Sequence, residues 1–600
     1  MNKEITRDEV QEKYKWDLTP IYKDEEEFNN DKDKALKLIE ELDNYKGRIT
    51  ENSETLYNFL KLEEDISVVI SNMFLYASCK RDEDLSNSEN QKRYNEVVNV
   101  DSIYMEKDSF TLPELLKTKY DVIEKYIEEN DKLKEFTFDL KEMYRFQKYV
   151  LSDKEEVLLS NISELGHKYE SNFNIIVDSI MDLGYITLDD GSEVKLTNGN
   201  YSKYSRSKSR NVRKQAYLNQ KNALKKFANL VSTDYEGNIK TDAMVAKARG
   251  YNSNLEMYLY NDGLTPTMYD NMLDIAHKNL NVLHKYYRMI KKISKIDDFK
   301  IYDISVPLLD KYDKKYTPED ARRMIVEALS VYGSEYTEIL DSAFENRWID
   351  FYPNKGKKSG YYETCVFKGH PVVLGNYNDD FLSVSSICHE LGHAMNSYYS
   401  FKNNPPHLAQ YTILVAEVAS ITNEVLLSNY IVKHSNDKFE KLEAIKNILE
   451  VFASNFFGTL SEGSIFEKIV HDRVYNGEML TELDFNEIYD KIAKEHYGSD
   501  VEVDDLIKYN WVRIPHFYSS FYYYKYSIGV SSALYVANKI LNGDEEFLNK
   551  YLDYLKLGGT MLPTDELKTI GIDLENPTFM QEAIDYFDNL IDEYERIYNS

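Results

Sequence analysis

Apolar residues recur every three or four positions along most of the chain, which predicts amphipathic helices that pack around a core. One such stripe is formed by Ala35, Leu38, Ile39 and Leu42. Glycine (23) and proline (12) are scarce among the 600 residues, so few positions interrupt these helices. The pattern therefore predicts a mainly α protein.

Three segments instead show the features of short β-strands. Tyr185 to Leu196 contains Asp190-Gly191 between two β-prone runs, which is a strong signature of a hairpin turn. Phe299 to Val306 alternates apolar and polar residues imperfectly, and Val366 to Tyr377 carries the apolar run Val372-Val373-Leu374. We expect a hairpin in the first segment and strands in the other two.

Composition and charge narrow the classes of function. The formal net charge is -30, which disfavours binding to a phosphate backbone, so no nucleic-acid partner is expected. No run of 18 or more apolar residues predicts a membrane span, and Met1 to Tyr22 lacks the apolar core of a signal peptide. Three cysteines are too few for a disulfide framework. These features predict a cytoplasmic protein with no membrane partner, and they leave its oligomeric state open.

The most informative motif is His389-Glu390-Leu391-Gly392-His393. Two histidines four residues apart project from one face of a helix and can both bind one Zn²⁺ ion. Glu390 lies one step round the helix, where a carboxylate can hold the reacting water as a general base. Chance would produce this pattern in roughly one chain in fifty of this length, so the motif needs support from its surroundings.

The surroundings place the motif on a packed helix. Ser383 to Tyr399 carries a core-facing apolar stripe, and Pro405-Pro406 prevents the helix from continuing. Zinc requires a third protein ligand. The glycine and histidine that follow the motif in metzincins are absent, because Asn396 and Tyr399 occupy those positions. The third ligand is therefore expected further along the chain.

A second helix, predicted from Thr412 to Val432, supplies a candidate for that ligand. It is apolar almost all round, yet Glu417, Ser420 and Glu424 form one polar stripe on it. A buried carboxylate without a partner costs several kcal/mol, so these residues need a cation or hydrogen-bond donors. We assign Glu417 as the third zinc ligand and Glu424 as a residue that orients a ligand. Pairing of Glu424 with an arginine or tyrosine is a competing interpretation.

Long stretches around these residues resemble a known family. They include RWIDFYPNKGKKSGYY from Arg347, HELGHAMNSYYSFKNNPPHLAQ from His389, YTILVAEVASITNE from Tyr411 and AKARGYNSNLEMYLYNDGL from Ala246. The chain is similar in these stretches to the oligoendopeptidase F group of the thimet oligopeptidase family, over roughly residues 15 to 590. The resemblance implies a cytoplasmic zinc oligopeptidase whose fold is a two-lobed helical enclosure with a deep substrate channel. It implies an N-terminal helical region, 1–195, that closes over a catalytic region, 196–600.

The resemblance also implies a cluster of histidine and tyrosine residues that stabilises the transition state. The matching segment here is RIPHFYSSFYYYKY from Arg513 to Tyr526, in which we choose His516, Tyr523 and Tyr526. The tetrahedral intermediate carries an oxyanion, and one hydrogen-bond donor to it commonly contributes a factor of about 10²–10³ in rate. Tyr518 and Tyr522 are competing candidates, and we keep Tyr518 as a substrate-binding residue.

Together these features predict an endopeptidase that cuts internal bonds of short, unfolded peptides with one Zn²⁺ per chain. His389, His393 and Glu417 hold the metal, and Glu390 takes the proton. His370 is expected to line the substrate channel, and the run Pro371 to Tyr377, which includes Gly375, to pair with the peptide backbone as an added strand. A metallocarboxypeptidase on a related helical scaffold and a non-catalytic peptide-binding scaffold are the alternatives.

Overall fold

The computed structural model describes residues 5–309 and 314–600, apart from some side chains between residues 153 and 167. The chain divides into two compact units, each assembled from three segments. Unit 1 comprises Met1–Val150, Lys314–Leu427 and Lys539–Ile570, and unit 2 comprises Leu151–Asp313, Ser428–Asn538 and Gly571–Ser600. The N-terminal region 1–195 and the catalytic region 196–600 predicted from the sequence are each one continuous segment. Their boundary therefore differs from the division into two compact units, each of which is built from three segments.

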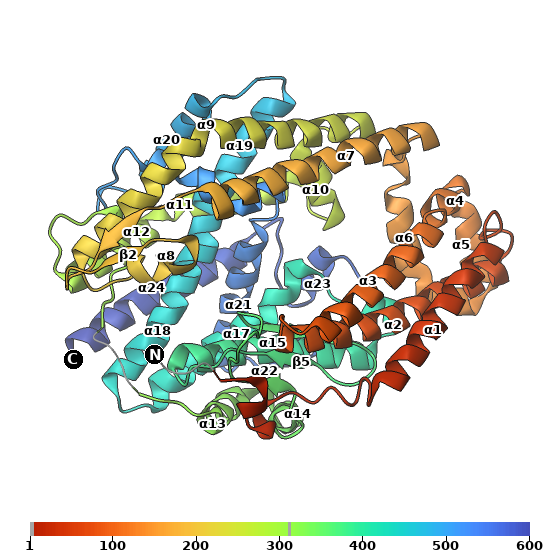
Figure 1. Cartoon of the computed structure of the whole chain (residues 1–600), viewed down its shortest axis with the longest axis horizontal. Coiled ribbons are helices and arrows are strands. Elements are labelled where there is room, and N and C mark those ends of the chain that lie inside the picture. The colour runs from red at the N-terminus through yellow and green to blue at the C-terminus, as the bar shows by residue number, and fades with distance from the viewer. Residues whose placement is uncertain (1–4, 310–313) are drawn as a thin grey trace. The chain divides into compact units, whose positions relative to one another are not determined.

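Unit 1 is built mainly of helices, which are red to orange in its first segment, green in its second and blue in its last in Figure 1. Their bounds are α1 Glu25–Glu41, α2 Ser53–Glu83, α3 Ser88–Asp108, α4 Thr111–Lys117, α5 Tyr120–Glu129, α6 Thr137–Arg145, α13 Pro318–Ala328, α14 Ser334–Glu345, α15 Phe381–Asn403, α16 Pro406–Ala409, α22 Glu545–Tyr554 and α23 Pro563–Thr569. Helices α1, α2 and α3 pack against one another. Ala35 and Ile39 of α1 and the adjoining Leu42 are buried, as the apolar stripe predicts.

Unit 1 also contains a three-stranded sheet in the order β3-β5-β4, which supports helix α15. Strand β5 (Val372–Leu374) pairs in parallel with β3 (Ile349–Asp350) and antiparallel with β4 (Tyr362–Thr364). All three side chains of β5 are fully buried, so the predicted apolar strand is confirmed over these residues. The sheet fixes the chain immediately before α15, and β4 packs against that helix.

Unit 2 is also helical, and its long helices α7 and α9 run side by side in Figure 1. Its helices are α7 Asp153–Asn174, α8 Asn198–Ser205, α9 Arg210–Arg249, α10 Asn254–Asn261, α11 Pro266–Lys278, α12 Leu280–Ser294, α18 Lys438–Phe452, α19 Ile465–Tyr475, α20 Glu482–Tyr497 and α24 Thr578–Asn599, with the π-helix η9 Ala453–Ser464 and the 3₁₀ helices η10 Ile507–Arg513 and η11 Pro515–Tyr518. Helices α17 (Ile413–His434) and α21 (Lys525–Leu541) each begin in one unit and end in the other. The predicted mainly α class is confirmed.

Two sequence predictions in unit 2 have opposite outcomes. The hairpin is confirmed, because β1 (Tyr185–Thr187) pairs antiparallel with β2 (Glu193–Lys195) across the Asp190-Gly191 turn. The strand predicted between Phe299 and Val306 is wrong, because residues 301–303 form a 3₁₀ turn. The buried carboxylate of Asp303 accepts hydrogen bonds from the Lys300 backbone N–H at 3.1 Å and from Arg213 at 2.7 Å. These hydrogen bonds hold residues 301–303 in the 3₁₀ turn.

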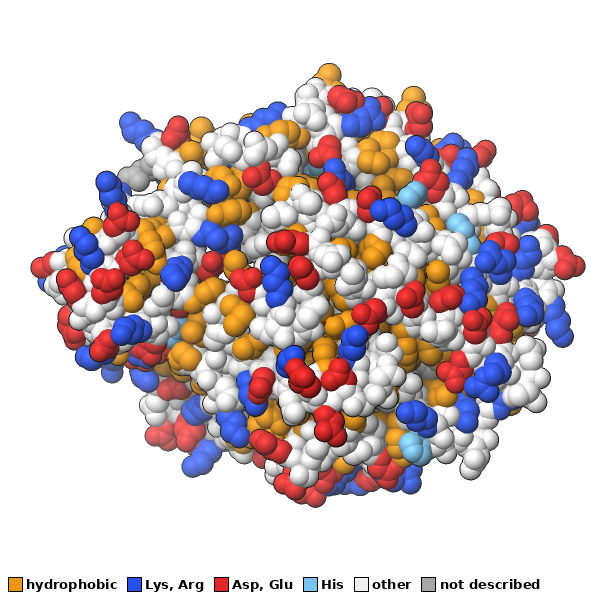
Figure 2. Space-filling view, turned by 180° about the vertical axis from the view of Figure 1, so that it is seen from behind, with side chains coloured by type: hydrophobic (Ala, Val, Ile, Leu, Met, Phe, Trp, Pro, Cys, Tyr) orange, Lys and Arg blue, Asp and Glu red, His pale blue; other side chains and the backbone are white. Residues whose placement is uncertain are grey.

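Charged side chains of both signs are interspersed over the face in Figure 2, and no broad basic patch stands out on it. No helix within the described residues is both long and apolar enough to cross a membrane.

Candidate active site

Helix α15 brings the residues of the motif together on one face. The side chain of Asp380 caps its first turn by accepting a hydrogen bond from the Ser383 N–H at 2.9 Å. The helix ends at Asn403, before Pro405-Pro406. The predicted helix is therefore confirmed and extends slightly further at both ends. Cys388, next to the motif, is fully buried and its thiol faces the carbonyl of Asn423 at 3.5 Å.

Helix α17 brings Glu417 beside the two histidines of α15. Oε2 of Glu417 lies 3.3 Å from Nε2 of His389 and 3.8 Å from Nε2 of His393. The ligand atoms of these three residues all lie within 4.8 Å of one another. Two imidazole nitrogens and one carboxylate oxygen form the ligand set of catalytic zinc sites that keep a fourth position open. The donor set therefore fits a zinc ion.

Neighbouring side chains orient two of these donors. Oε1 of Glu424 accepts a hydrogen bond from Nδ1 of His389 at 2.7 Å. The other ring nitrogen of this histidine, Nε2, then faces Glu417. The hydroxyl of Ser385 donates to the other oxygen of Glu424 at 2.8 Å. Ser420 donates to Oε2 of Glu417 at 2.9 Å. The sequence prediction missed Ser385, although its position four residues before His389 places it on the same helix face.

Replacing Glu424 with alanine is expected to weaken zinc binding by about 10–100-fold, because Nδ1 of His389 loses the acceptor that fixes its ring. Competition with a chelating dye measures the affinity, and the exposed Glu338→Ala on α14 is the control. Unchanged zinc affinity in Glu424→Ala would show that the carboxylate does not orient the histidine.

Gly392 permits the close contact between α15 and α17. A Cβ atom at this position would lie 2.5 Å from Cα of Ser420 and 2.8 Å from the carbonyl oxygen of Ala419. No side chain fits at position 392 without displacing α17. That helix carries Glu417, three residues before Ser420. The sequence prediction did not include Gly392, because a lone glycine inside a helix shows its purpose only when the neighbouring helix is known.

We expect Gly392→Ala to lower the free energy of unfolding by about 1–3 kcal/mol, because α17 must move to relieve the overlap. Zinc affinity should fall with it, since Glu417 moves with the helix. Urea unfolding and zinc titration measure the two effects. Gly166→Ala is the matched control, because no atom lies within 4 Å of the position its Cβ would take. If Gly392→Ala matches that control in both measurements, the close contact does not position Glu417.

Burial and charge set the ionisation of the site. Burial raises the pKa of the Glu390 carboxyl to about 7, and the side chain is only 7% exposed. Burial and the charge of His389 lower the pKa of His393 to about 4, so its imidazole is neutral at pH 7. Burial opposes ionisation of Glu417, but hydrogen bonding and charge from His389 outweigh it and lower its pKa to about 2. A neutral imidazole and an ionised carboxylate are the forms that bind a metal, so His393 and Glu417 are in those forms. Burial opposes protonation of His389, but hydrogen bonds and charge from Glu417 and Glu424 outweigh it and raise the pKa of His389, so a metal ion would displace the proton of that imidazole.

In unit 2, the predicted His516, Tyr523 and Tyr526 lie together. Nε2 of His516 lies 3.3 Å from the hydroxyl of Tyr526, and its ring stacks on Tyr523 with centroids 5.0 Å apart. Tyr522 also lies against His516, at 6.2 Å between centroids. Tyr518 lies apart from this group, since its ring packs in the buried aromatic core of unit 2.

The residues predicted to bind the peptide have structural contacts of their own. The ring of His370 stacks on Trp348, with centroids 5.1 Å apart. The N–H of Gly375 donates to the carbonyl of Asp350 at 2.8 Å. Strand β5, within the predicted peptide-pairing run, is hydrogen-bonded on both edges by β3 and β4. It cannot accept a further strand, so that part of the prediction is wrong.

Comparisons with known proteins cover almost the whole chain. The model of peptidase family M3 matches residues 203–586, and that of the oligopeptidase F family matches residues 114–182. Oligopeptidase PepF of Bacillus subtilis is 31% identical over 98% of this chain and 88% of its own length. A putative peptidase from Chlamydophila abortus has a similar structure with a TM-score of 0.91, at 30% identity over 99% of this chain and all of its own. The oligoendopeptidase-F structure from Enterococcus faecium is similar with a TM-score of 0.74 at 26% identity, over 96% of this chain and 99% of its own.

Proposed function

This chain belongs to peptidase family M3, and on that premise we propose that it is a zinc-dependent endopeptidase acting on internal bonds of short, unfolded peptides. Its family membership makes it a metallo-oligopeptidase. The observation that carries the finer proposal is the convergence of His389, His393 and Glu417 within 4.8 Å, next to the buried Glu390. A non-catalytic scaffold would not need a general base beside a complete set of zinc ligands.

The metal would be held by Nε2 of both histidines and by the carboxylate of Glu417. When bound, Zn²⁺ supplies a Lewis acid that polarises the scissile carbonyl and lowers the pKa of a water molecule. Glu424 keeps His389 in the orientation that directs Nε2 at the metal position.

Glu390 moves the proton in this proposal. Its carboxylate accepts a proton from the attacking water and then donates it to the nitrogen of the leaving amine. A pKa near 7 suits a group that must both accept and return a proton at neutral pH. No hydrogen bond to this carboxylate is found among the described residues, which leaves it available to a water molecule.

We assign His516, Tyr523 and Tyr526 the stabilisation of the oxyanion and the positioning of the peptide. Tyr526→Phe removes one hydroxyl donor, so kcat should fall by about 10²–10³-fold. Steady-state hydrolysis of a fluorogenic peptide measures the effect, and Tyr522→Phe is the control, with an expected change of less than about threefold. Equal losses in the two variants would contradict a specific role for Tyr526.

The peptide backbone would pair with the outer edge of β4. Strand β5 is hydrogen-bonded on both edges, whereas β4 is the last strand of its sheet and packs against α15. Pairing through main-chain hydrogen bonds gives affinity with little dependence on sequence. Short peptides of varied sequence are therefore the proposed substrates.

The proposed site of action is the cytoplasm. Cys79, Cys365 and Cys388 are all free thiols, and two of them are buried. Unpaired cysteines are stable where the cell keeps thiols reduced.

Cleavage of an internally quenched peptide of about ten residues, acetylated and amidated at its ends, tests the endopeptidase assignment. Mass spectrometry of the products should show internal cleavage at a rate close to that of the same peptide with free ends. If the blocked peptide stays intact while the peptide with free ends loses residues from its C-terminus, the protein is instead a carboxypeptidase.

A further inference from the structure

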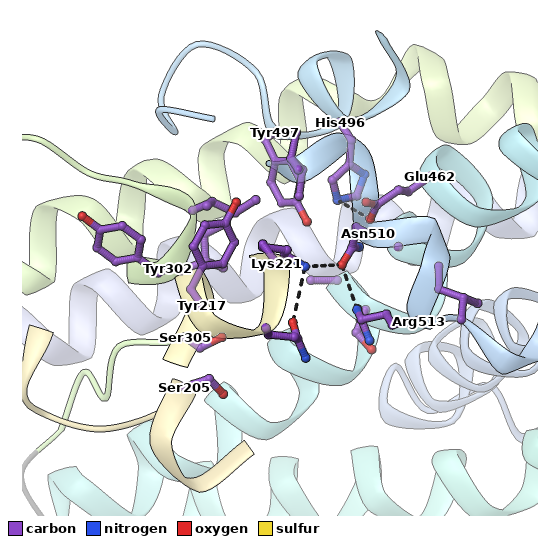
Figure 3. Close-up of a pocket in the computed structure, with 18 of the residues that line it drawn as sticks. Ser205, Tyr217, Lys221, Tyr302, Ser305, Glu462, His496, Tyr497, Asn510 and Arg513 are labelled. Atoms are coloured by element: carbon purple, nitrogen blue, oxygen red, sulfur yellow. Dashed lines mark hydrogen bonds and ion pairs between the residues drawn. The ribbon is translucent and has the colours of Figure 1, made fainter. Parts of the chain in front are cut away.

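Unit 2 contains a cavity of about 440 Å³ that none of the zinc residues line. It is formed by α8, α9, α12, α20, η9 and η10, and Figure 3 shows its lining. Eight tyrosines face it, namely Tyr201, Tyr217, Tyr286, Tyr287, Tyr302, Tyr489, Tyr497 and Tyr523. A volume of this size is typical of small-molecule sites, and the lining combines these aromatic rings with many polar and charged side chains.

Two of the four basic residues in the cavity have carboxylate partners. Arg206 pairs with Glu450 at 3.0 Å. Arg213, which is 1% exposed, pairs with Asp303 at 2.7 Å. The charges of these two arginines are therefore already compensated by the protein.

Lys221 and Arg513 lack such compensation. Lys221 is 4% exposed, and its Nζ contacts Oδ1 of Asn510, with Oε1 of Gln220 at 3.4 Å. Arg513 donates through Nε to the same Oδ1 of Asn510 at 2.8 Å, as Figure 3 shows. No carboxylate of the described residues lies at ion-pair distance from either group. A buried lysine amine and a solvent-exposed guanidinium thus converge on one neutral acceptor, the amide oxygen of Asn510.

Besides Glu450, which pairs with Arg206, the acidic residue in the lining is Glu462, and it has partners of its own. Glu462 accepts a hydrogen bond from the hydroxyl of Tyr489 and lies 3.9 Å from Nε2 of His496. Burial, together with the charge of Arg513, lowers the pKa of Lys221 well below its usual value. A charged ammonium at the buried position of Lys221 is costly without a partner, and an anion between Lys221 and the exposed Arg513 would offset that cost.

We propose that this cavity is a binding site for a small organic carboxylate of about the size of an amino acid or dipeptide. The carboxylate would lie between Nζ of Lys221 and the guanidinium of Arg513, whose planar fork matches a carboxylate. The body of the ligand would lie against the tyrosine rings. A bare inorganic anion would fill little of the 440 Å³ and would leave the aromatic lining unused. None of the zinc residues takes part in this site, but it shares Tyr523 with the oxyanion cluster proposed above.

The irregular helix beside the cavity is an independent sign of a functional site. The π-helix η9 (Ala453–Ser464) supplies Gly458, Glu462 and Gly463 to the lining. π-Helical turns are rare and occur often at functional sites. A Cβ atom at Gly463 would lie 2.2 Å from the ring of Tyr523, so this glycine makes room for a tyrosine that faces the cavity.

Isothermal titration of the zinc-loaded protein with N-acetyl-L-phenylalanine and with its amide tests the proposal. We expect the acid to bind at least about tenfold more tightly than the amide, because only the acid carries the charge that Lys221 and Arg513 would pair. Lys221→Met and Arg513→Gln should each weaken binding of the acid by at least about tenfold. Arg206→Gln is the matched control, since Arg206 lines the same cavity but has its own partner, and it should change affinity by less than about twofold.

Each alternative result would overturn the proposal. Equal affinity for acid and amide would exclude carboxylate recognition, and so would absence of binding. Binding of the acid that survives both substitutions would place it elsewhere, for example at the zinc. Inorganic phosphate that displaces the acid with equal or higher affinity would assign the site to another anion. If circular dichroism shows that Lys221→Met and Arg513→Gln do not fold, the comparison of acid, amide and phosphate on the wild type decides.

Discussion

Replacing Glu390 with glutamine is expected to lower kcat for a quenched peptide by about 10³-fold, while the protein keeps one zinc per chain. The amide has nearly the same size and polarity as the carboxylate, but it cannot accept the proton of the attacking water. Glu390 does not belong to the group of three donors that converge within 4.8 Å, so metal binding should be unaffected. Rapid kinetics and elemental analysis of the same preparation measure both quantities.

Asp380→Asn is a suitable control for this substitution, because it makes the same chemical change on the same helix at its N-terminal cap. An asparagine caps a helix about as well as an aspartate, so activity should change little. If Glu390→Gln retains more than a few per cent of wild-type activity with full zinc content, another group acts as the base.

Replacing Glu417 with alanine is expected to remove metal and activity together. The substitution deletes the only carboxylate in the group of three donors. Zinc affinity should fall by more than about 100-fold, which exceeds the loss expected for a residue, such as Glu424, that only orients a ligand. Competition with a chelating dye gives the affinity, and peptide hydrolysis is followed at rising zinc concentration.

The comparison with Glu424→Ala separates the two glutamates of α17. Both side chains contact His389, but Glu417 faces its Nε2 and Glu424 its Nδ1. A direct ligand contributes more than a residue that orients one, so the larger loss of zinc affinity is expected in Glu417→Ala. The reverse order would exchange the assigned roles, and full zinc affinity in Glu417→Ala would require a different third ligand.

The sequence predicts which residues come together at the candidate site because its signals there are local or follow helix periodicity. His389 and His393 are four residues apart, so any helix places them on one face. Glu417 is conspicuous because a carboxylate on an almost wholly apolar helix needs a partner. The structure brings these residues together, although their roles as ligands remain predictions.

The features that sequence reasoning missed depend on contacts between distant segments. Phe299 to Val306 has the composition of a strand, but buried Asp303 binds Arg213, which lies 90 positions earlier, and the segment coils. Strand β5 was expected to pair with a peptide, yet β3 and β4 occupy both of its edges. The role of Gly392 follows from the position of Ser420 on another helix. No periodic pattern in the sequence indicates any of these long-range contacts.

The most direct test of the central claim is titration of zinc into protein stripped of metal, with cleavage of the doubly blocked peptide as the readout. We expect no hydrolysis without metal, a linear rise in rate up to one zinc per chain, and no rise with Glu417→Ala over the same range. Full hydrolysis by the metal-free protein, or a metal-dependent rate that is the same in Glu417→Ala, would contradict a zinc peptidase built on His389, His393 and Glu417.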